Sequence, residues 1–267
     1  MLIDKNLKIA ITAALKAGEA ILKIYNKDFS VEYKEDESPL TEADLVSNKI
    51  IVTLLQETNL PIISEENKQL PYSIRKEWKQ CWIVDPIDGT KEFIKKNGEF
   101  TVNIALVENG ITKLGVIYVP VTKELYYTNE SKSKAYKTVF ADNIEDINGV
   151  LFKEEDILKP NQEVNGIVKV VGSRSHMNED TLNYVEGLKH NGNDIEIVSK
   201  GSSLKFCLVA EGQADVYPRF APTMEWDTAA GQAICEAVGL KVLNQTTNEP
   251  MKYNRENLLN NYFLVTK

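Results

Sequence analysis

The sequence predicts a mixed α/β fold, and three stretches carry this prediction. Apolar residues recur at three- and four-residue intervals between residues 7 and 25, which is typical of one face of a helix. Strand-like runs follow between residues 100 and 127, and the second half of the chain alternates strand-like and helix-like segments. We therefore expect an N-terminal α+β domain at residues 1–158 and a C-terminal α/β domain at residues 159–267.

The first half is expected to open with two helices. The first should cover about residues 5–26. A second should begin near Thr41, because Thr41 and Asp44 have the spacing of a capping box, with Asp in place of the usual Glu or Gln. Residues 60–63 then indicate a brief strand, and the apolar residues 82–84 indicate a buried one.

The centre of the chain is expected to form a sheet that is at least partly antiparallel. Strand-like runs cover residues 100–107, 114–119 and 124–127. The pair Asn109-Gly110 separates the first two runs and is a strong hairpin signal, because both residues tolerate the positive φ angles of a tight turn. From residue 128 to 163 the sequence changes character, and we place the domain boundary near the end of that stretch.

The second half is expected to alternate strands with helices. Strands are predicted at residues 167–171 and 195–198, and helices at 178–190 and 204–210. The Ala-rich stretch from residue 228 to 238 predicts a further helix, which Gly239 would end. Residues 240–243 and 262–265 are the expected closing strands.

Composition narrows the class of function. The formal net charge of −8 argues against a surface that binds a nucleic-acid polymer, so an anionic small substrate would need metal ions or a local basic pocket. The three cysteines are far apart and lack C-x-x-C spacing, which disfavours a disulfide framework or a zinc site and favours a reducing cytoplasm. We expect no signal peptide and no membrane-spanning segment. Association with the inner face of the cell membrane, and the choice between monomer and homodimer, stay open.

One strand is expected to end in two carboxylates. The segment is Asp85-Pro86-Ile87-Asp88-Gly89-Thr90. Its proline lacks an amide hydrogen, so we expect the chain to turn there rather than continue a ladder. Such a turn would let both carboxylates and the Ile87 carbonyl converge on a hard cation such as Mg²⁺, while the amides of Gly89 and Thr90 bind phosphate at the start of a helix. The spacing is common, and an ordinary turn with a helix cap is the alternative.

Three further acidic residues are candidates for the same site. Asp44 falls in the first turn of a predicted helix, Glu65 follows a predicted strand, and Asp227 is expected at the N-cap of the Ala-rich helix. Each also has a plain structural explanation. Asp44 would be stabilised by the helix dipole, and Glu65 would lie in a solvated loop. Asp227 would be a helix N-cap, which stabilises a helix by ~1 kcal/mol.

Candidate substrate contacts lie in the second half of the chain. Ser202 and Ser203 occupy a strand-to-helix turn suited to holding phosphate, and Lys205 and Arg219 supply positive charge nearby. His176 is one of two histidines and follows a predicted strand end. Ligand contact and a packed surface position are both open for it.

Four segments occur in order along the chain and together carry a resemblance. They are Thr41-Glu42-Ala43-Asp44, Ser64-Glu65-Glu66, Asp85-Pro86-Ile87-Asp88-Gly89-Thr90 and Trp226-Asp227-Thr228-Ala229-Ala230-Gly231. The set resembles the inositol monophosphatase superfamily of metal-dependent phosphatases. The extensions of these segments, together with Ser173-Arg174-Ser175-His176, Gly201 to Cys207 and Tyr217-Pro218-Arg219, are similar to the bacterial 3′(2′),5′-bisphosphate nucleotidases.

The resemblance implies a fold and a reaction. The fold would be a layered α-β-α-β-α sandwich. The reaction would be hydrolysis of the 3′-phosphate of adenosine 3′,5′-bisphosphate to AMP, with two or three Mg²⁺ ions required and Li⁺ inhibitory. We hypothesise in-line attack by a metal-activated water, because no Ser, Cys or His nucleophile with an adjacent base is evident.

The roles implied by the resemblance are specific. One Mg²⁺ would be held by Glu65, Asp85 and the carbonyl of Ile87, and a second by Asp85, Asp88 and Asp227. Thr90, oriented by Asp44, would position the water, with Glu65 also contributing to catalysis. Substrate binding would fall to Gly89, Thr90, His176, Ser202, Ser203, Lys205, Arg219 and Asp227.

Two other functions remain open on the sequence. The same metal site could serve inositol 1-phosphate or fructose 1,6-bisphosphate. The chain could also be a nucleotide-binding protein without catalysis, although no expected carboxylate is missing. Lys205 and Arg219 favour a doubly phosphorylated nucleotide, because a second phosphate needs a second cationic site.

Overall fold

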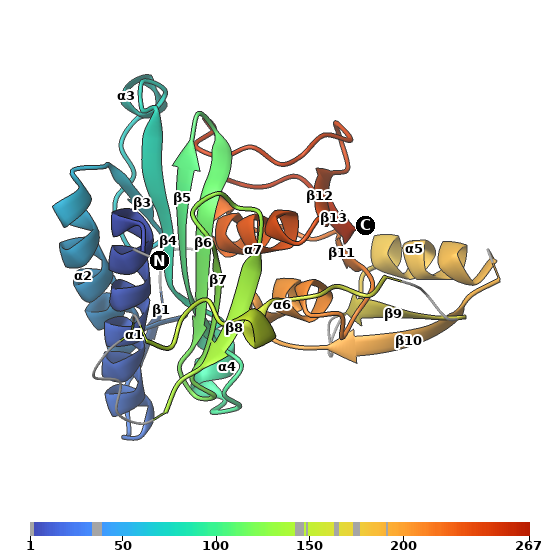
Figure 1. Cartoon of the computed structure of the whole chain (residues 1–267), viewed down its shortest axis with the longest axis horizontal. Coiled ribbons are helices and arrows are strands. Elements are labelled where there is room, and N and C mark those ends of the chain that lie inside the picture. Colours follow the sequence, from blue (N-terminus) through green and yellow to red (C-terminus); the bar gives the residue numbers. More distant parts are fainter. Residues whose placement is uncertain are drawn as a thin grey trace.

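Helices and sheets alternate in layers across the molecule. The computed structural model describes residues 3–33, 39–141, 147, 149–162, 166–172, 177–190 and 192–267. Figure 1 shows two N-terminal helices on one face of a large central sheet, two further helices on its other face, and the C-terminal strands with one last helix beyond them. The predicted α-β-α-β-α sandwich is therefore confirmed. The division into domains at residues 1–158 and 159–267 stays a prediction.

The outer layer consists of α1 (Lys5–Tyr25) and α2 (Glu42–Leu55). The Thr41 hydroxyl caps α2 by accepting a bond from the Ala43 amide at 3.2 Å, and Asp44 completes the capping box by accepting from the Thr41 amide at 2.8 Å. A short antiparallel pair, β1 (Val31–Tyr33) and β2 (Pro39–Thr41), leads into α2 and was not predicted.

The central sheet has six strands in the order β3-β4-β5-β6-β7-β8. Their bounds are β3 Ile62–Ser64, β4 Gln80–Asp88, β5 Thr101–Glu108, β6 Ile111–Val119, β7 Glu124–Thr128 and β8 Ala135–Val139. The first pair is parallel and every later pair is antiparallel. The hairpin at Asn109-Gly110 is confirmed, with φ angles of 50° and 78°. The sequence analysis missed β8.

One prediction about the central sheet is wrong. The chain does not leave the ladder at Pro86, because β4 continues to Asp88. Its pairing with β5 shifts register between Asp85 and Asp88, where a bulge interrupts the ladder. A proline is tolerated in such a bulge because no amide hydrogen is needed there.

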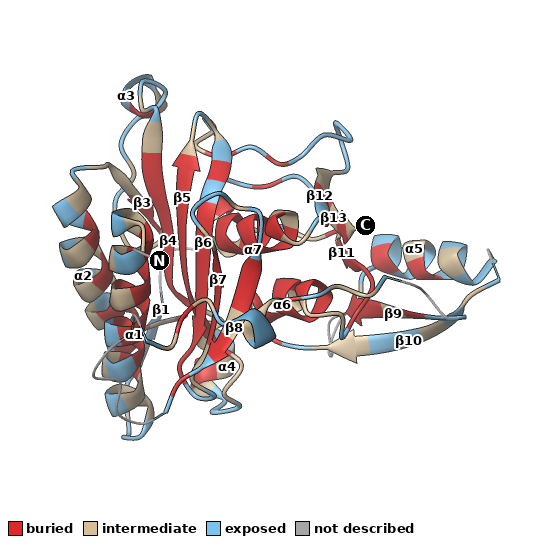
Figure 2. Ribbon diagram, in the orientation of Figure 1, coloured by how far each residue is buried: buried red, intermediate tan, exposed pale blue. Residues whose placement is uncertain are grey.

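The opposite face of the sheet is covered by α6 (Leu204–Ala210) and α7 (Glu225–Ala237). Helix α7 lies very close to β6, since a Cβ at Gly115 would come 2.5 Å from the carbonyl oxygen of Ala230. A glycine is needed at this position for the helix to approach the strand. Figure 2 shows the buried residues concentrated on the central strands and on the inner sides of the helices that flank them.

The C-terminal layer contains two small sheets. One pairs β9 (Ile167–Gly172) with β10 (Asp194–Ser199) in parallel, and α5 (Glu179–His190) packs against β10. The other has the order β11-β13-β12, with β11 Tyr217–Arg219, β12 Lys241–Asn244 and β13 Phe263–Thr266. The short helices α3 (Tyr72–Arg75) and α4 (Thr90–Ile94) and the 3-10 turns Gln56–Thr58 and Glu154–Asp156 complete the elements.

Candidate active site

The ends of two parallel strands bring three of the predicted carboxylates to one edge of the central sheet. Glu65 directly follows β3, and its amide donates to the carbonyl of Val84 in β4 at 3.2 Å. Asp85 and Asp88 form the last part of β4. The bulge after Asp85 shifts the strand register, and the Asp85 Oδ1 accepts a bond from the amide of Ile87 at 3.1 Å within it.

Burial and neighbouring negative charges both disfavour the ionised form of Asp85. Its side chain is buried, and the pKa of its carboxyl lies well above the ordinary range because burial disfavours the charged form. The negative charges of Glu65, Asp88, Asp227 and Asp44 raise this pKa further, in that order. The carboxylates of this group thus disfavour one another's charged form, and a divalent cation is a chemical species that would neutralise them.

Asp88 is held by donors from both halves of the chain. Its Oδ2 accepts bonds from the hydroxyls of Ser203 at 2.7 Å and Ser202 at 2.9 Å, and from the Asn103 side-chain amide at 3.4 Å. Ser203 is itself buried and accepts a bond from the same Asn103 amide at 2.8 Å. These contacts fix one carboxylate oxygen of Asp88 and thereby orient the other.

Asp227 reaches the site from α7, although not from the position that we predicted. The helix begins at Glu225 with Met224 as its N-cap, so Asp227 is the third helical residue rather than the cap. Its Oδ2 accepts a bond from the Met224 amide at 2.8 Å, which closes the first turn in the manner of a capping box. Burial raises the pKa of Asp227 to about 8, and the charge of Asp88 contributes in the same direction.

Asp44 and Thr90 meet beside these carboxylates. The Thr90 hydroxyl lies 3.2 Å from Asp44 Oδ1 and 3.4 Å from the carbonyl oxygen of Ile87. The other oxygen of Asp44 accepts from the Thr41 amide and hydroxyl at 2.8 Å and 2.7 Å. Asp44 therefore caps α2 and orients Thr90 at the same time. The expected helix after Gly89 is present as α4, and Gly89 has a φ of 94°.

Most of these carboxylates line one cavity of about 460 Å³, which we call the acidic cavity. Its lining includes Glu65, Asp85, Ile87, Asp88, Thr90 and Asp227. These six residues offer carboxylate, carbonyl and hydroxyl oxygens, which suit Mg²⁺ rather than a softer metal. Within the described ranges no three His, Cys, Asp or Glu side chains form a ready metal-ligand group as they stand. The donor chemistry fits Mg²⁺, and the assignment of individual ligands stays a prediction.

A second cavity of about 590 Å³ adjoins the first and shares Asp88, Gly89 and Asp227 with it; we call it the basic cavity. The side chains of Lys205 and Arg219 line it. The positive charges that line it are Lys91, Lys95, Lys200, Lys205 and Arg219.

Among the described residues, Lys205 and Arg219 each donate one hydrogen bond, in both cases to a backbone carbonyl. Burial lowers the pKa of Lys205, against the raising effect of Asp88, and its Nζ donates only to the carbonyl of Ser202 at 3.0 Å in the described part of the chain. Arg219 donates to the carbonyl of Pro222 at 3.2 Å, and among the described residues its buried Nε has no partner. His176 lies outside the described residues.

Two residues of the site were missed by the sequence analysis. Asn103 lies opposite Asp85 in the β4–β5 pairing and is almost fully buried. Its only signal in the sequence is a single amide side chain within the apolar run of a strand. Tyr217 lines the basic cavity from β11, a strand that was not predicted.

Comparison with known proteins agrees with this geometry. The model of the inositol monophosphatase family matches residues 3–264. The chain belongs to the inositol monophosphatase family. Structures of family members include the inositol monophosphatase of Thermotoga maritima, which is 22% identical with a TM-score of 0.72 over 98% of this chain and 92% of its own.

Within the family, the resemblance to bacterial bisphosphate nucleotidases is confirmed. The 3′(2′),5′-bisphosphate nucleotidase CysQ of Salmonella typhimurium is 42% identical over 260 residues, which cover 95% of this chain and 96% of the relative. The crystal structure of CysQ from Bacteroides thetaiotaomicron is 49% identical, with a TM-score of 0.85 over 98% of this chain and 96% of that one. The described residues contain no helix long and apolar enough to cross a membrane.

Proposed function

We propose that this chain is a Mg²⁺-dependent phosphatase that removes the 3′-phosphate of adenosine 3′,5′-bisphosphate to give AMP and phosphate. The observation that carries the proposal is the pair of adjoining cavities, one acidic and one basic, which share Asp88, Gly89 and Asp227. The names of the CysQ relatives support the same substrate class.

The acidic cavity is the proposed site of the scissile phosphate. Glu65, Asp85, the carbonyl of Ile87, Asp88 and Asp227 are the residues that would hold Mg²⁺ there. Mg²⁺, when bound, would lower the pKa of a coordinated water and neutralise negative charge on the phosphate. The protein's own part is orientation: the Thr90 hydroxyl donates to Asp44 at 3.2 Å, and its oxygen lone pairs can then accept a bond from a water.

The basic cavity is the proposed site of the second phosphate. The Arg219 guanidinium retains unused donors, one of which is the buried and unpaired Nε. A phosphate oxygen would satisfy this donor and recover the cost of its burial. Lys205 provides a second charge, and its lowered pKa indicates a strongly desolvated ammonium that an anion would stabilise.

A third cavity of about 460 Å³ extends from the basic cavity and suits the nucleoside. It shares Lys205, Tyr217 and Arg219 with the basic cavity, and residues such as Val171, Met177 and Phe220 make its lining more apolar. We assign the scissile phosphate to the acidic cavity, the second phosphate to the basic cavity and the base to the third cavity; one ribose carries all three groups. An inositol monophosphate would leave the last two unfilled.

The test is phosphate release from adenosine 3′,5′-bisphosphate, inositol 1-phosphate and fructose 1,6-bisphosphate. Each substrate is assayed with Mg²⁺, with EDTA, and with Mg²⁺ plus Li⁺. We expect the highest kcat/KM for the nucleotide, loss of release in EDTA, and inhibition by Li⁺. A preference for either sugar phosphate would retain the acidic cavity and overturn the specificity, while no release from any substrate would overturn the catalytic proposal.

A further inference from the structure

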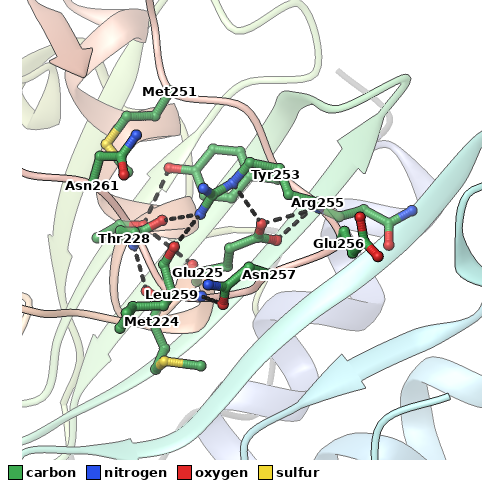
Figure 3. Close-up of polar contacts among 12 residues, drawn as sticks. Met224, Glu225, Thr228, Met251, Tyr253, Arg255, Glu256, Asn257, Leu259 and Asn261 are labelled. Carbon is green, nitrogen blue, oxygen red and sulfur yellow. Dashed lines mark hydrogen bonds and ion pairs between the residues drawn. The ribbon is translucent and has the colours of Figure 1, made fainter. Parts of the chain in front are cut away.

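A buried ion pair adjoins Asp227 and has no part in the proposed chemistry. Glu225 lies in the first turn of α7, and its side chain is 0% exposed. Its Oε1 accepts bonds from the Arg255 Nε at 3.0 Å and the Arg255 amide at 3.1 Å, and its Oε2 accepts from the Asn254 amide at 2.6 Å. Figure 3 shows Glu225 and Arg255 facing each other beside the start of the helix. These three bonds tie the first turn of α7 to residues 254 and 255.

Asn254 and Arg255 belong to a segment, residues 254–260, that contacts the first turn of α7 at several points. The Glu225 amide donates to the Leu258 carbonyl at 2.9 Å, and Met224 forms an antiparallel bridge with Leu259. The Asn260 side-chain amide donates to the Met224 carbonyl at 2.7 Å and to the Thr228 hydroxyl at 3.0 Å. Bonds therefore run from the segment to Met224 and Glu225, which precede Asp227 by three and two residues, and to Thr228, which follows it.

The 254–260 segment is anchored at its other side by Arg75. This buried arginine closes α3, which lies in the connection between β3 and β4. Its guanidinium donates to Asn254 Oδ1 at 2.8 Å, to the Arg255 carbonyl at 3.1 Å and to the Glu256 carbonyl at 3.2 Å. The Asn254 side-chain amide returns a bond to the Arg75 carbonyl at 2.8 Å. The segment thus links the connection that joins Glu65 to Asp85 with the turn that carries Asp227.

We propose that Glu225 and Arg75 are positioning residues, which act through the 254–260 segment to set the separation between Asp227 and the carboxylates at the ends of β3 and β4. This inference rests on the proposed cation site. Like charges drive these carboxylates apart, as the raising effect of Glu65, Asp88 and Asp227 on the pKa of Asp85 indicates. A helix end is also the part of a helix that frays first. The bonds from residues 254–260 to the first turn of α7 oppose both the repulsion between the carboxylates and the fraying of the helix end.

The test variants are Glu225→Gln and Arg75→Gln, and the matched control is Glu236→Gln. Glu236 belongs to the same helix and pairs with Lys132 at 2.6 Å, but it lies nine residues after Asp227, or ~14 Å along the helix. Arg255→Ala is a further variant, since the Arg255 side chain is 30% exposed and its truncation is tolerated more easily. It keeps the test valid if Glu225→Gln does not fold.

Two readouts separate positioning from mere stability. Mg²⁺ alone is titrated into each protein by calorimetry at pH 8, and the urea midpoint is measured on the same samples. We expect Glu225→Gln, Arg75→Gln and Arg255→Ala to weaken Mg²⁺ binding roughly tenfold, as changes to residues that orient metal ligands commonly do. Glu236→Gln should lower the urea midpoint and leave Mg²⁺ affinity unchanged. The Mg²⁺ concentration for half-maximal phosphatase activity should rise in the same variants, while KM at saturating Mg²⁺ stays near that of the wild type.

Each outcome bears on a different statement. Unchanged Mg²⁺ affinity in folded Glu225→Gln, Arg75→Gln and Arg255→Ala would overturn the positioning role and leave the cation site in place. A wild-type protein that binds no Mg²⁺ would overturn the cation site and this inference together. Weakened binding in Glu236→Gln as well would show that any loss of stability lowers the affinity, which also overturns the inference.

Discussion

The hydroxyl of Ser203 lies 2.7 Å from Asp88 Oδ2, across 115 residues of sequence. The same hydroxyl oxygen lies 2.9 Å from the carbonyl of Asp227. Ser203 therefore contacts both Asp88 of β4 and Asp227 of α7. It connects the two halves of the chain at the acidic cavity. We expected this serine to bind substrate, and its contacts indicate a role in orienting Asp88 as well.

Substitution of Ser203 by Ala should weaken Mg²⁺ binding more than substrate binding. The change removes a charge-assisted bond, and such bonds contribute about 1.5–3 kcal/mol. We expect the half-saturating Mg²⁺ concentration to rise roughly tenfold or more, with a smaller change in KM. The matched control is Thr138→Val, which removes a hydroxyl bonded to Asp156 at 2.7 Å in β8, remote from the cavity. A Ser203→Ala enzyme with wild-type Mg²⁺ dependence would contradict this role.

The Thr90 hydroxyl should be required for turnover and dispensable for metal binding. Its bond to Asp44 fixes its orientation, and positioned proton-transfer groups contribute on the order of 10²-fold or more to kcat. We expect Thr90→Val to lower kcat by about that factor and Thr90→Ser, which retains the hydroxyl, to keep most of the activity. Calorimetry should give similar Mg²⁺ affinities for both. Equal kcat values for the two variants would rule out the role of the hydroxyl.

Lys205 and Arg219 should discriminate between substrates. Replacement of either by Gln removes a charge from the basic cavity, so KM for adenosine 3′,5′-bisphosphate should rise about 10- to 100-fold. Turnover of inositol 1-phosphate, which lacks a second phosphate, should change little. Lys241→Gln removes an exposed charge from β12 and serves as the control. An equal loss of kcat/KM for both substrates would contradict the assignment of the second phosphate to this cavity.

The sequence predicted local capping and helix patterns better than it predicted the short strands β1, β2, β8 and β11. Thr41 with Asp44, Glu65, and the Asp85 to Thr90 segment are local patterns, and the helix expected from residue 204 to about residue 210 is present as α6. Local patterns survive folding because propensity and capping act over a few residues. The strand β8 has a weak apolar pattern and forms only because β7 offers it a free edge.

Two contacts between distant residues of the site were not predicted. The bond between Asp88 and Ser203, and the position of Asn103 opposite Asp85, depend on strand register and helix packing. The proline prediction was wrong for a related reason. A bulge at residues 85–88 removes the demand for an amide hydrogen at Pro86, and bulges arise from the pairing of two strands rather than from one strand's sequence.

The metal-free protein should become less stable as pH rises, and Mg²⁺ should reverse this trend. Burial raises the pKa of Asp227 from 3.8 to about 8, so between these values the folded state binds more protons than the unfolded state. Stability therefore falls as pH increases through that window. The raised pKa of Asp85 acts in the same direction. In EDTA, the melting temperature should decline from about pH 4 to about pH 8.

Mg²⁺ binds the deprotonated carboxylates, so it should stabilise the protein most at the upper end of this window and release protons at the lower end. Melting curves with and without saturating Mg²⁺ at each pH measure the first effect, and calorimetry in two buffers of different ionisation enthalpy measures the second. Asp227→Asn is the informative variant, because an amide cannot titrate and the decline in EDTA should flatten. A wild-type melting temperature in EDTA that rises with pH across the window would contradict the raised pKa values that burial and neighbouring carboxylates cause.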